Sequence, residues 1–195
     1  MAIYLVRHGE TSLNQEKKFY GSLDIELNEV GRCQSEKVAD KLKHLSFEAV
    51  YISGLKRTKQ TAELIAPKNT HQIIPELNEK SFGVWEGLSA DEIELNYPEE
   101  WQAWLEEPFD KTPPEAETFS SFKQRVLAGM RRIEKDFDEK NQTNILIIGH
   151  LGVLRVLDQY FNREIIDFWS IDYKQGTYTV YEFKNQHYHL VERCR

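Results

Sequence analysis

The sequence predicts an α/β fold, a three-layer α/β/α sandwich on a mainly parallel central sheet, with a small helical lid insertion. Short apolar runs at 2–6, 49–52, 72–74 and 144–148 have the length and composition of strands. Segments whose apolar residues recur at helical spacing alternate with these runs, as is typical of parallel sheets. Two of these runs are followed by Arg-His or Gly-His. In open α/β sheets, ligands bind at this position, just beyond the carboxyl ends of the strands.

The first half of the chain supplies three of the predicted strands. Residues 2–6 are strand formers, and residues 10–24 are predicted to be a polar loop. Asn28 is suited to cap a helix that runs to about residue 45. Residues 47–53 contain the second strand, a helix follows over 55–66 until Pro67, and Pro75 ends the third strand. Strands and helices therefore alternate in this half, as the predicted sandwich requires.

The second half begins with an irregular stretch that is rich in Glu, Pro and Trp. Within it, residues 86–117 form the expected insertion, with short helices over 90–95 and 99–105. Thr118 can cap a long helix whose apolar residues recur in steps of three and four: Phe119, Phe122, Val126, Met130, Ile133 and Phe137. The strand at 144–148 is apolar throughout, and a helix follows it to residue 161. Residues 177–183 and 187–191 are predicted to form an antiparallel pair.

Length and composition indicate one domain over residues 1–195. The net charge of −7 argues against a nucleic-acid binder. Cys33 and Cys194 fit no metal or redox spacing. The chain shows neither a basic leader nor an apolar run of membrane-spanning length, so we expect a cytoplasmic protein without a membrane partner. The sequence leaves open whether it forms a homodimer.

Phosphate-binding chemistry follows three of the predicted strands. The first strand is followed by Arg7 and His8, and Gly9 permits a sharp turn. The second is followed by Ser53 and Arg57, and the fourth by His150. Because parallel strands end at one edge of a sheet, these side chains are expected to converge on a dianion. No acidic metal-ligand cluster accompanies them, so neither a metal nor another cofactor is expected.

A phosphoryl transfer site also needs a proton donor for the leaving group. The stretch after the third strand supplies three candidate carboxylates, at Glu76, Glu79 and Glu86. Ser53 can touch the site, although a role in capping the following helix fits it equally well. Glu10 and Thr11 are expected to shape the loop rather than take part in the chemistry.

Four ordered motifs connect these residues to a known family. They are Arg7-His8-Gly9-Glu10-Thr11 with Asn14, Ser53-x-x-x-Arg57-x-x-x-Thr61, Glu79-x-x-Phe82-Gly83-x-Trp85-Glu86-Gly87, and Gly149-His150-x-Gly152. In this order they resemble the histidine phosphatase superfamily, in its phosphoglycerate mutase-like branch, from residue 3 to about residue 157. The resemblance implies that fold and a metal-independent phosphomonoesterase that works through a phosphohistidine and acts on a small phosphate monoester.

The resemblance also implies a role for each residue. His8 would be the nucleophile, kept in the right tautomer by the carbonyl of Gly9. Arg7, Arg57 and Asn14 would bind the phosphate oxygens, and a protonated His150 would be a further catalytic donor to them. Glu79 would protonate the leaving group and later activate water. Glu86 is the competing carboxylate.

Within the superfamily, residues 73–79, 82–86 and 150–154 are similar to α-ribazole-phosphate phosphatases of cobalamin assembly. Those enzymes tend to carry a Gly-Glu or Gly-Gly-Glu-Ser stretch before the long helix, where this chain has Glu115-Ala116-Glu117-Thr118. The alternatives are a broad-specificity phosphatase, a phosphoprotein phosphatase, a phosphoglycerate mutase and a non-catalytic regulatory protein. Mutases resemble one another in a longer chain and in a Tyr-Gly pair after the acidic residue, both missing here. A regulatory protein is expected to have lost a site residue.

Four aromatic residues in or beside the insertion, Tyr97 and Trp85, Trp101 and Trp104, have two interpretations. They can form a lid that stacks on an aromatic leaving group. They can equally pack the short helices onto the body of the protein.

Overall fold

A six-stranded sheet forms the centre of the computed structural model, which describes residues 2–140, 143–162 and 167–195. The strand order is β3-β2-β4-β1-β5-β6. The strands are β1 (Ala2–Arg7), β2 (Ala49–Ile52), β3 (His71–Ile73), β4 (Asn144–Gly149), β5 (Tyr178–Lys184) and β6 (His187–Glu192). The first four pair in parallel, whereas β5 and β6 pair antiparallel. The mainly parallel sheet with an antiparallel C-terminal part is confirmed.

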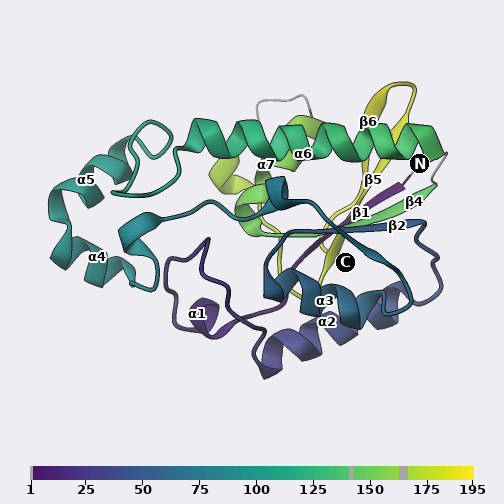
Figure 1. Ribbon diagram of the computed structural model, residues 1–195, viewed down its shortest axis with the longest axis horizontal. Coiled ribbons are helices and arrows are strands. Elements are labelled where there is room, and N and C mark those ends of the chain that lie inside the picture. The colour runs from purple at the N-terminus through teal and green to yellow at the C-terminus, as the bar shows by residue number, and fades with distance from the viewer. Residues whose placement is uncertain (1, 141–142, 163–166) are drawn as a thin grey trace.

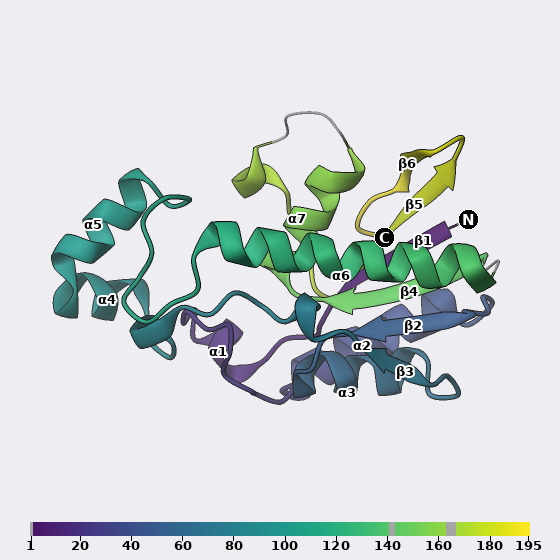
Figure 2. The same ribbon diagram turned by 45° about the horizontal axis from the view of Figure 1, so that its top comes forward.

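Helices cover both faces of this sheet and complete the three layers (Figures 1 and 2). On one face lie α2 (Glu29–Leu42) and α3 (Lys56–Ile65), and on the other lie α6 (Phe119–Lys140) and α7 (Leu151–Phe161). Asn28 caps α2 through its side chain, as predicted, and α2 ends at Leu42, a few residues before the predicted end. Thr118 Oγ1 accepts a hydrogen bond from the Ser121 amide and so caps α6.

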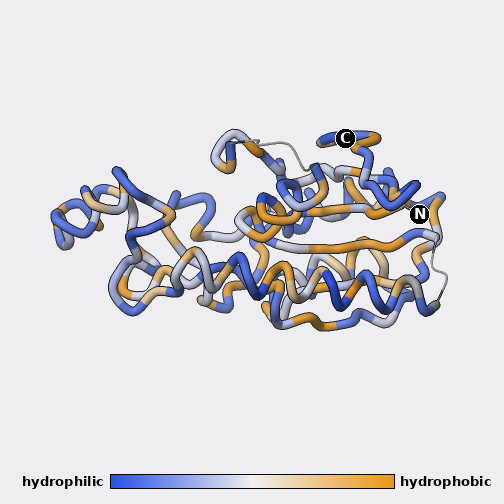
Figure 3. Tube along the Cα trace, turned by 90° about the horizontal axis from the view of Figure 1, so that it is seen from above, coloured by the Kyte–Doolittle hydropathy of each residue, from blue (hydrophilic) through white to orange (hydrophobic). Residues whose placement is uncertain are grey.

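The apolar strands provide a core to each helical layer because successive side chains point to opposite faces. Ile3 and Leu5 of β1 belong to the cluster with α6 and α7, while Val6 belongs to the cluster with α2 and α3. In β4, Ile147 and Ile148 divide in the same way. Figure 3 shows the apolar strands in the middle of the molecule. Burial on both faces explains why these strands are apolar throughout.

The predicted polar loop at 10–24 contains a short helix, α1 (Ser12–Gln15), which the sequence analysis missed. Thr11 caps it, because its hydroxyl accepts from the Asn14 amide while Asn14 Oδ1 accepts from the Thr11 amide. Three single-turn 3-10 helices were also not predicted: η1 (Pro75–Leu77), η2 (Gly83–Trp85) and η3 (Phe168–Ser170).

The insertion contains the two expected helices, α4 (Ala90–Asn96) and α5 (Pro98–Glu106). Ser89 and Glu92 form a capping box at the start of α4, and Pro98 occupies the first turn of α5. Both helices project from the end of the molecule toward which β1 and β4 point (Figures 1 and 2). Over the described ranges, no helix combines the length and the apolar character needed to cross a membrane.

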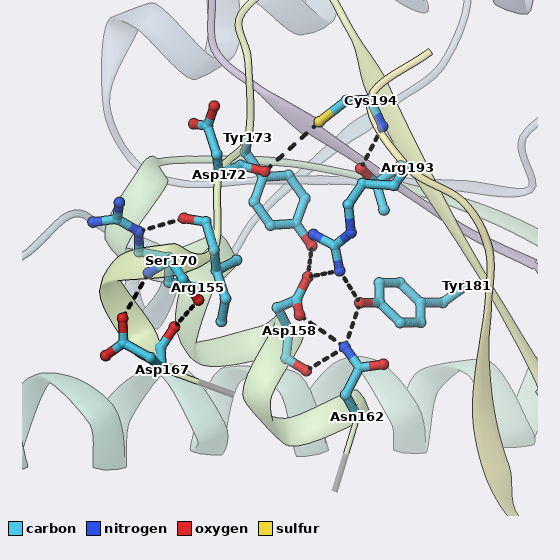
Figure 4. A network of polar contacts seen from close by, with 12 residues as sticks. Arg155, Asp158, Asn162, Asp167, Ser170, Asp172, Tyr173, Tyr181, Arg193 and Cys194 are labelled. Carbon is cyan, nitrogen blue, oxygen red and sulfur yellow. Dashed lines mark hydrogen bonds and ion pairs between the residues drawn. The ribbon is translucent and has the colours of Figure 1, made fainter. Parts of the chain in front are cut away.

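A buried polar network ties α7 to the C-terminal residues (Figure 4). Asp158 is fully buried and accepts hydrogen bonds from Tyr173 Oη at 2.7 Å, Arg193 Nη2 at 2.8 Å and Asn162 Nδ2 at 2.7 Å. Tyr181 Oη accepts from Arg193 and Asn162 at the same place. The network connects β5 and the chain end to the helix that follows His150.

Candidate active site

Five of the six predicted site residues line one cavity of about 350 Å³ beyond the ends of β1 and β4. They are Arg7, His8, Asn14, Arg57 and Glu79. The parallel register places Arg7 directly beside Gly149, so the ends of β1 and β4 meet at the floor of this cavity. The convergence that the sheet topology predicts is therefore present.

His8 is almost fully buried and has a defined tautomer. Its Nδ1 lies 2.7 Å from the Gly9 carbonyl oxygen, which can only accept, so Nδ1 carries the proton and Nε2 keeps its lone pair. Burial, together with the positive charges of Arg57 and Arg7, holds the pKa of His8 well below 6.5. The imidazole is therefore neutral and has the state that a nucleophile needs.

Close packing against α2 requires a glycine at position 9. A Cβ on Gly9 would lie 2.3 Å from the carbonyl oxygen of Gly31 in α2, so only glycine fits between β1 and that helix. The Gly9 amide donates to Thr61 Oγ1 at 3.1 Å, and Thr61 in turn donates to the Arg57 carbonyl. These contacts fix the carbonyl that orients His8.

The two predicted arginines present donors to the cavity. Arg57 is fully buried and donates from Nη1 to the Leu23 carbonyl and from Nη2 to the Gly21 carbonyl, each at 2.8 Å. Each terminal nitrogen has a second N–H, so the guanidinium retains donors while its position is fixed. The buried Nε of Arg7 has no hydrogen-bond partner among the described residues. Such a donor is costly to leave unpaired and is suited to an anionic oxygen.

Burial and the neighbouring Arg57 lower the pKa of His150, which disfavours the protonated state that the resemblance implies. Its Nδ1 accepts from Arg57 Nε at 3.2 Å, and its Nε2 lies 2.8 Å from Ser53 Oγ. His150 does not line the cavity. Its contacts orient Arg57, and its direct role in phosphate binding stays a prediction.

Asn14 is held by its amide oxygen. Its Oδ1 accepts from Tyr20 Oη at 2.8 Å and from Gln175 Nε2 at 3.0 Å, in addition to the capping contacts with Thr11. With the oxygen engaged in this way, Nδ2 is the atom that remains to donate into the cavity. The Arg57 guanidinium also lies over the Tyr20 ring, with Cζ 4.8 Å from the ring centroid.

Glu79 and Glu86, the competing carboxylates, have different environments. Glu79 lines the cavity, and its two oxygens accept from the Lys80 and Gly152 amides at 2.9 Å. A Cβ on Gly152 would lie 2.6 Å from Glu79 Oε1, so this glycine admits the carboxylate. Glu86 lies outside the lining and accepts from Ser22, Leu23 and Phe82. Burial raises the pKa of Glu86, but these hydrogen bonds outweigh it and lower the pKa overall.

The cavity also has aromatic walls, to which Phe82, Trp104, Phe119, Phe122, Phe168 and Trp169 contribute. The two interpretations of the tryptophans therefore divide between residues. Trp85 is fully buried and packs, with Trp101, against Phe19. Trp104 belongs to the same cluster, stacks on Trp101 at 5.5 Å and also lines the cavity.

The sequence analysis missed Tyr20, Lys80 and Arg155, which also line the cavity. Burial lowers the pKa of Lys80 and raises that of Tyr20. Arg155 lies over the rings of Phe168 and Trp169, 5.4 Å from each centroid. Its spacing of four from Leu151, another lining residue on α7, is a signal that could have identified it.

The match to a family model covers almost the whole chain: residues 3–194 fit the histidine phosphatase superfamily (branch 1). The chain belongs to this superfamily. It is 31% identical to an adenosylcobalamin/α-ribazole phosphatase from Salmonella typhimurium, over 92% of this chain and 89% of the relative. It is 30% identical to phosphoserine phosphatase 1 from Hydrogenobacter thermophilus, over 91% of this chain and 84% of the relative.

Solved structures agree with these matches. A crystal structure of a putative α-ribazole-5′-P phosphatase from Escherichia coli superposes on this histidine phosphatase with a TM-score of 0.92. The two chains are 28% identical, and the match covers 100% of this chain and 96% of the other. The superfamily and the named relatives identify the protein as a phosphatase. In the described part of the phosphatase, no group of three or more His, Cys, Asp or Glu side chains is arranged to hold a metal ion.

The neutral state of the two buried histidines predicts a pH dependence of stability. His8 and His150 have folded-state pKa values below the unfolded value of about 6.5, so the unfolded chain binds protons that the folded chain does not. The free energy of unfolding therefore has its full value above about pH 6.5 and decreases as the pH falls below it. The limiting slope is about 1.4 kcal/mol per pH unit for each histidine. Urea unfolding between about pH 7 and pH 5.5 measures this slope.

A His150→Gln variant should show a smaller slope than wild type. His44→Gln, which replaces an exposed histidine that does not line the cavity, is the matched control variant. A His150→Gln variant with the wild-type slope would contradict the account.

Proposed function

We propose that this phosphatase hydrolyses phosphate monoesters through a phosphohistidine on His8 and that its preferred substrate is α-ribazole 5′-phosphate. The observation that carries the proposal is the cavity itself. It joins a floor of His8, Arg7 and Arg57 to aromatic walls, with Glu79 beside the floor. The floor suits a phosphate dianion, and the walls suit an apolar, planar leaving group.

In the first step, His8 Nε2 attacks phosphorus in line with the ester oxygen. The P–N bond forms as the P–O bond breaks, and Glu79 gives its proton to the departing oxygen. Arg7, Arg57 and Asn14 donate to the remaining oxygens, where negative charge is concentrated in the transition state. In the second step, Glu79 takes a proton from water, the water oxygen attacks phosphorus, and the P–N electron pair returns to Nε2.

The preference for α-ribazole 5′-phosphate rests on the aromatic walls, since its base is a benzimidazole. Relatives named adenosylcobalamin/α-ribazole phosphatase support it, and the relative named phosphoserine phosphatase supports a small charged substrate instead. The cations Lys17, Lys18 and Arg155 line the cavity and could hold a carboxylate. The two substrates would therefore contact different residues of the cavity: α-ribazole 5′-phosphate its aromatic rings, and phosphoserine its cations.

A substrate panel separates them. We expect kcat/KM for α-ribazole 5′-phosphate to exceed that for phosphoserine, 3-phosphoglycerate and a phosphotyrosine peptide by several hundredfold. Trp104→Ala should reduce this preference about fivefold, because one stacked ring contributes roughly 1 kcal/mol. Trp101→Ala is the matched control, since it removes an indole of the same cluster that does not line the cavity. Similar modest values of kcat/KM for all substrates would contradict the proposed preference. A higher kcat/KM for phosphoserine would contradict it too and would make phosphoserine the better substrate.

A further inference from the structure

Arg125 of α6 uses all five of its N–H groups within one small region. Nη1 donates to the carbonyl oxygens of Glu76 at 2.8 Å and Asn78 at 2.6 Å. Nη2 donates to the Glu79 carbonyl at 3.1 Å and to Glu117 Oε2 at 2.7 Å, and Nε donates to Glu117 Oε1 at 2.6 Å. A guanidinium has five donors, so none remains for another partner.

The carbonyls that Arg125 binds belong to the segment that carries Glu79, from Glu76 in η1 to Glu79 itself. This segment follows β3 and has no neighbouring strand, so its backbone needs other partners. Arg125 supplies them from a helix that Phe122 and Val126 anchor in the core. The Gly54 amide, which donates to Asn78 Oδ1 at 2.7 Å, fixes the segment from the end of β2.

Glu117 completes the arrangement from the residues just before α6. Its carboxylate meets Arg125 through two parallel hydrogen bonds, the pairing that fixes a guanidinium in one plane. Its amide donates to the Ser81 carbonyl at 3.3 Å, two residues beyond Glu79. Arg125 and Glu117 therefore hold the backbone on both sides of Glu79, although Arg125 does not line the cavity.

We propose that Arg125, with Glu117, is a positioning residue that sets the place of the Glu79 carboxyl relative to the leaving-group oxygen. The inference rests on the proton-transfer role proposed for Glu79. Proton transfer requires the two oxygens to be within hydrogen-bond reach. Lysine cannot take over the function, because an ammonium has three donors and lacks the planar fork.

A positioning role and a purely structural role predict different substrate dependence. Nitrophenyl phosphate has a leaving group that hardly needs protonation, whereas an alkyl phosphate needs it. If Arg125 acts through Glu79, Arg125→Lys lowers kcat/KM for the alkyl phosphate by about tenfold to a hundredfold and for nitrophenyl phosphate much less. Partial unfolding would lower both rates equally, because both substrates are assayed on the same sample.

The experiment compares kcat/KM for both substrates in wild type, Arg125→Lys, Glu79→Gln and the double variant. Glu79→Gln should show the selective loss on the alkyl phosphate, and adding Arg125→Lys to it should bring no further selective loss. Glu117→Gln should show a weaker form of the same selectivity and carries the test if Arg125→Lys fails to fold. Arg132→Lys is the matched control, since Arg132 lies on the same helix, is exposed and reaches Glu76 only at 4.0 Å.

Equal losses on the two substrates in Arg125→Lys, or a selective loss that persists in the Glu79→Gln background, would overturn the positioning role. Glu79→Gln without any selectivity would remove Glu79 as the acid, and the positioning role with it. Neither of these results bears on whether His8 carries the phosphoryl group, so a failure of the inference is distinguishable from a failure of the nucleophile assignment.

Discussion

Replacing His8 with alanine is expected to lower kcat at least about a thousandfold, because a nucleophile that forms the covalent intermediate has no substitute in the site. His8 is the lining residue whose unprotonated ring nitrogen is fixed by a hydrogen bond on the other nitrogen. His150 cannot take over, since Arg57 and Ser53 engage both of its nitrogens. Steady-state phosphate release from nitrophenyl phosphate measures the loss.

His44→Ala serves as the control for this variant, because His44 is an exposed histidine in the turn just after α2 and does not line the cavity. Circular dichroism confirms that His8→Ala is folded before its rate is compared. Residual activity above about a thousandth of wild type would exclude His8 as the nucleophile.

Replacing Asp158 with alanine is expected to lower the free energy of unfolding by about 3 kcal/mol or more. The substitution removes the acceptor of three hydrogen bonds and leaves the Tyr173 hydroxyl, in a nearly fully buried residue, without its partner. It also leaves Arg193 without the carboxylate that offsets its charge. Urea denaturation at neutral pH measures the change.

Asp40→Ala removes a carboxylate from an exposed helix position, where Asp40 pairs with Lys43 at 3.6 Å, and should change stability by less than about 0.5 kcal/mol. A loss in Asp158→Ala no larger than in Asp40→Ala would show that the network in Figure 4 contributes little to stability.

Most of the fold follows from local patterns. The strands of the parallel sheet are apolar runs, and α6 has a long stripe of apolar residues at helical spacing. The boundaries also follow where a capping residue marks them, as Asn28 and Thr118 do. By contrast, α1 spans four residues and depends on the capping pair of Thr11 and Asn14, so no periodic pattern announces it.

The site divides in the same way. The convergence of Arg7, His8 and Arg57 could be predicted, because parallel strands end at one edge of the sheet, and the family resemblance added Glu79 to them. The neutral state of His150 could not, since it depends on burial and on an Arg57 contact 93 positions away in the chain. The Arg125 contacts depend likewise on tertiary packing, as they join α6 to a segment 46 to 49 residues earlier.

The central claim, that the phosphoryl group passes through His8, is tested most directly by trapping it there. Radiolabelled nitrophenyl phosphate, whose leaving group hardly needs a proton from Glu79, is mixed with the Glu79→Gln variant, in which activation of the second-step water is slowed, and the reaction is quenched in alkali within milliseconds. The account predicts label that is stable in alkali, is lost in acid and maps to the peptide containing His8. Turnover without label on that peptide, or label on another residue, would contradict it.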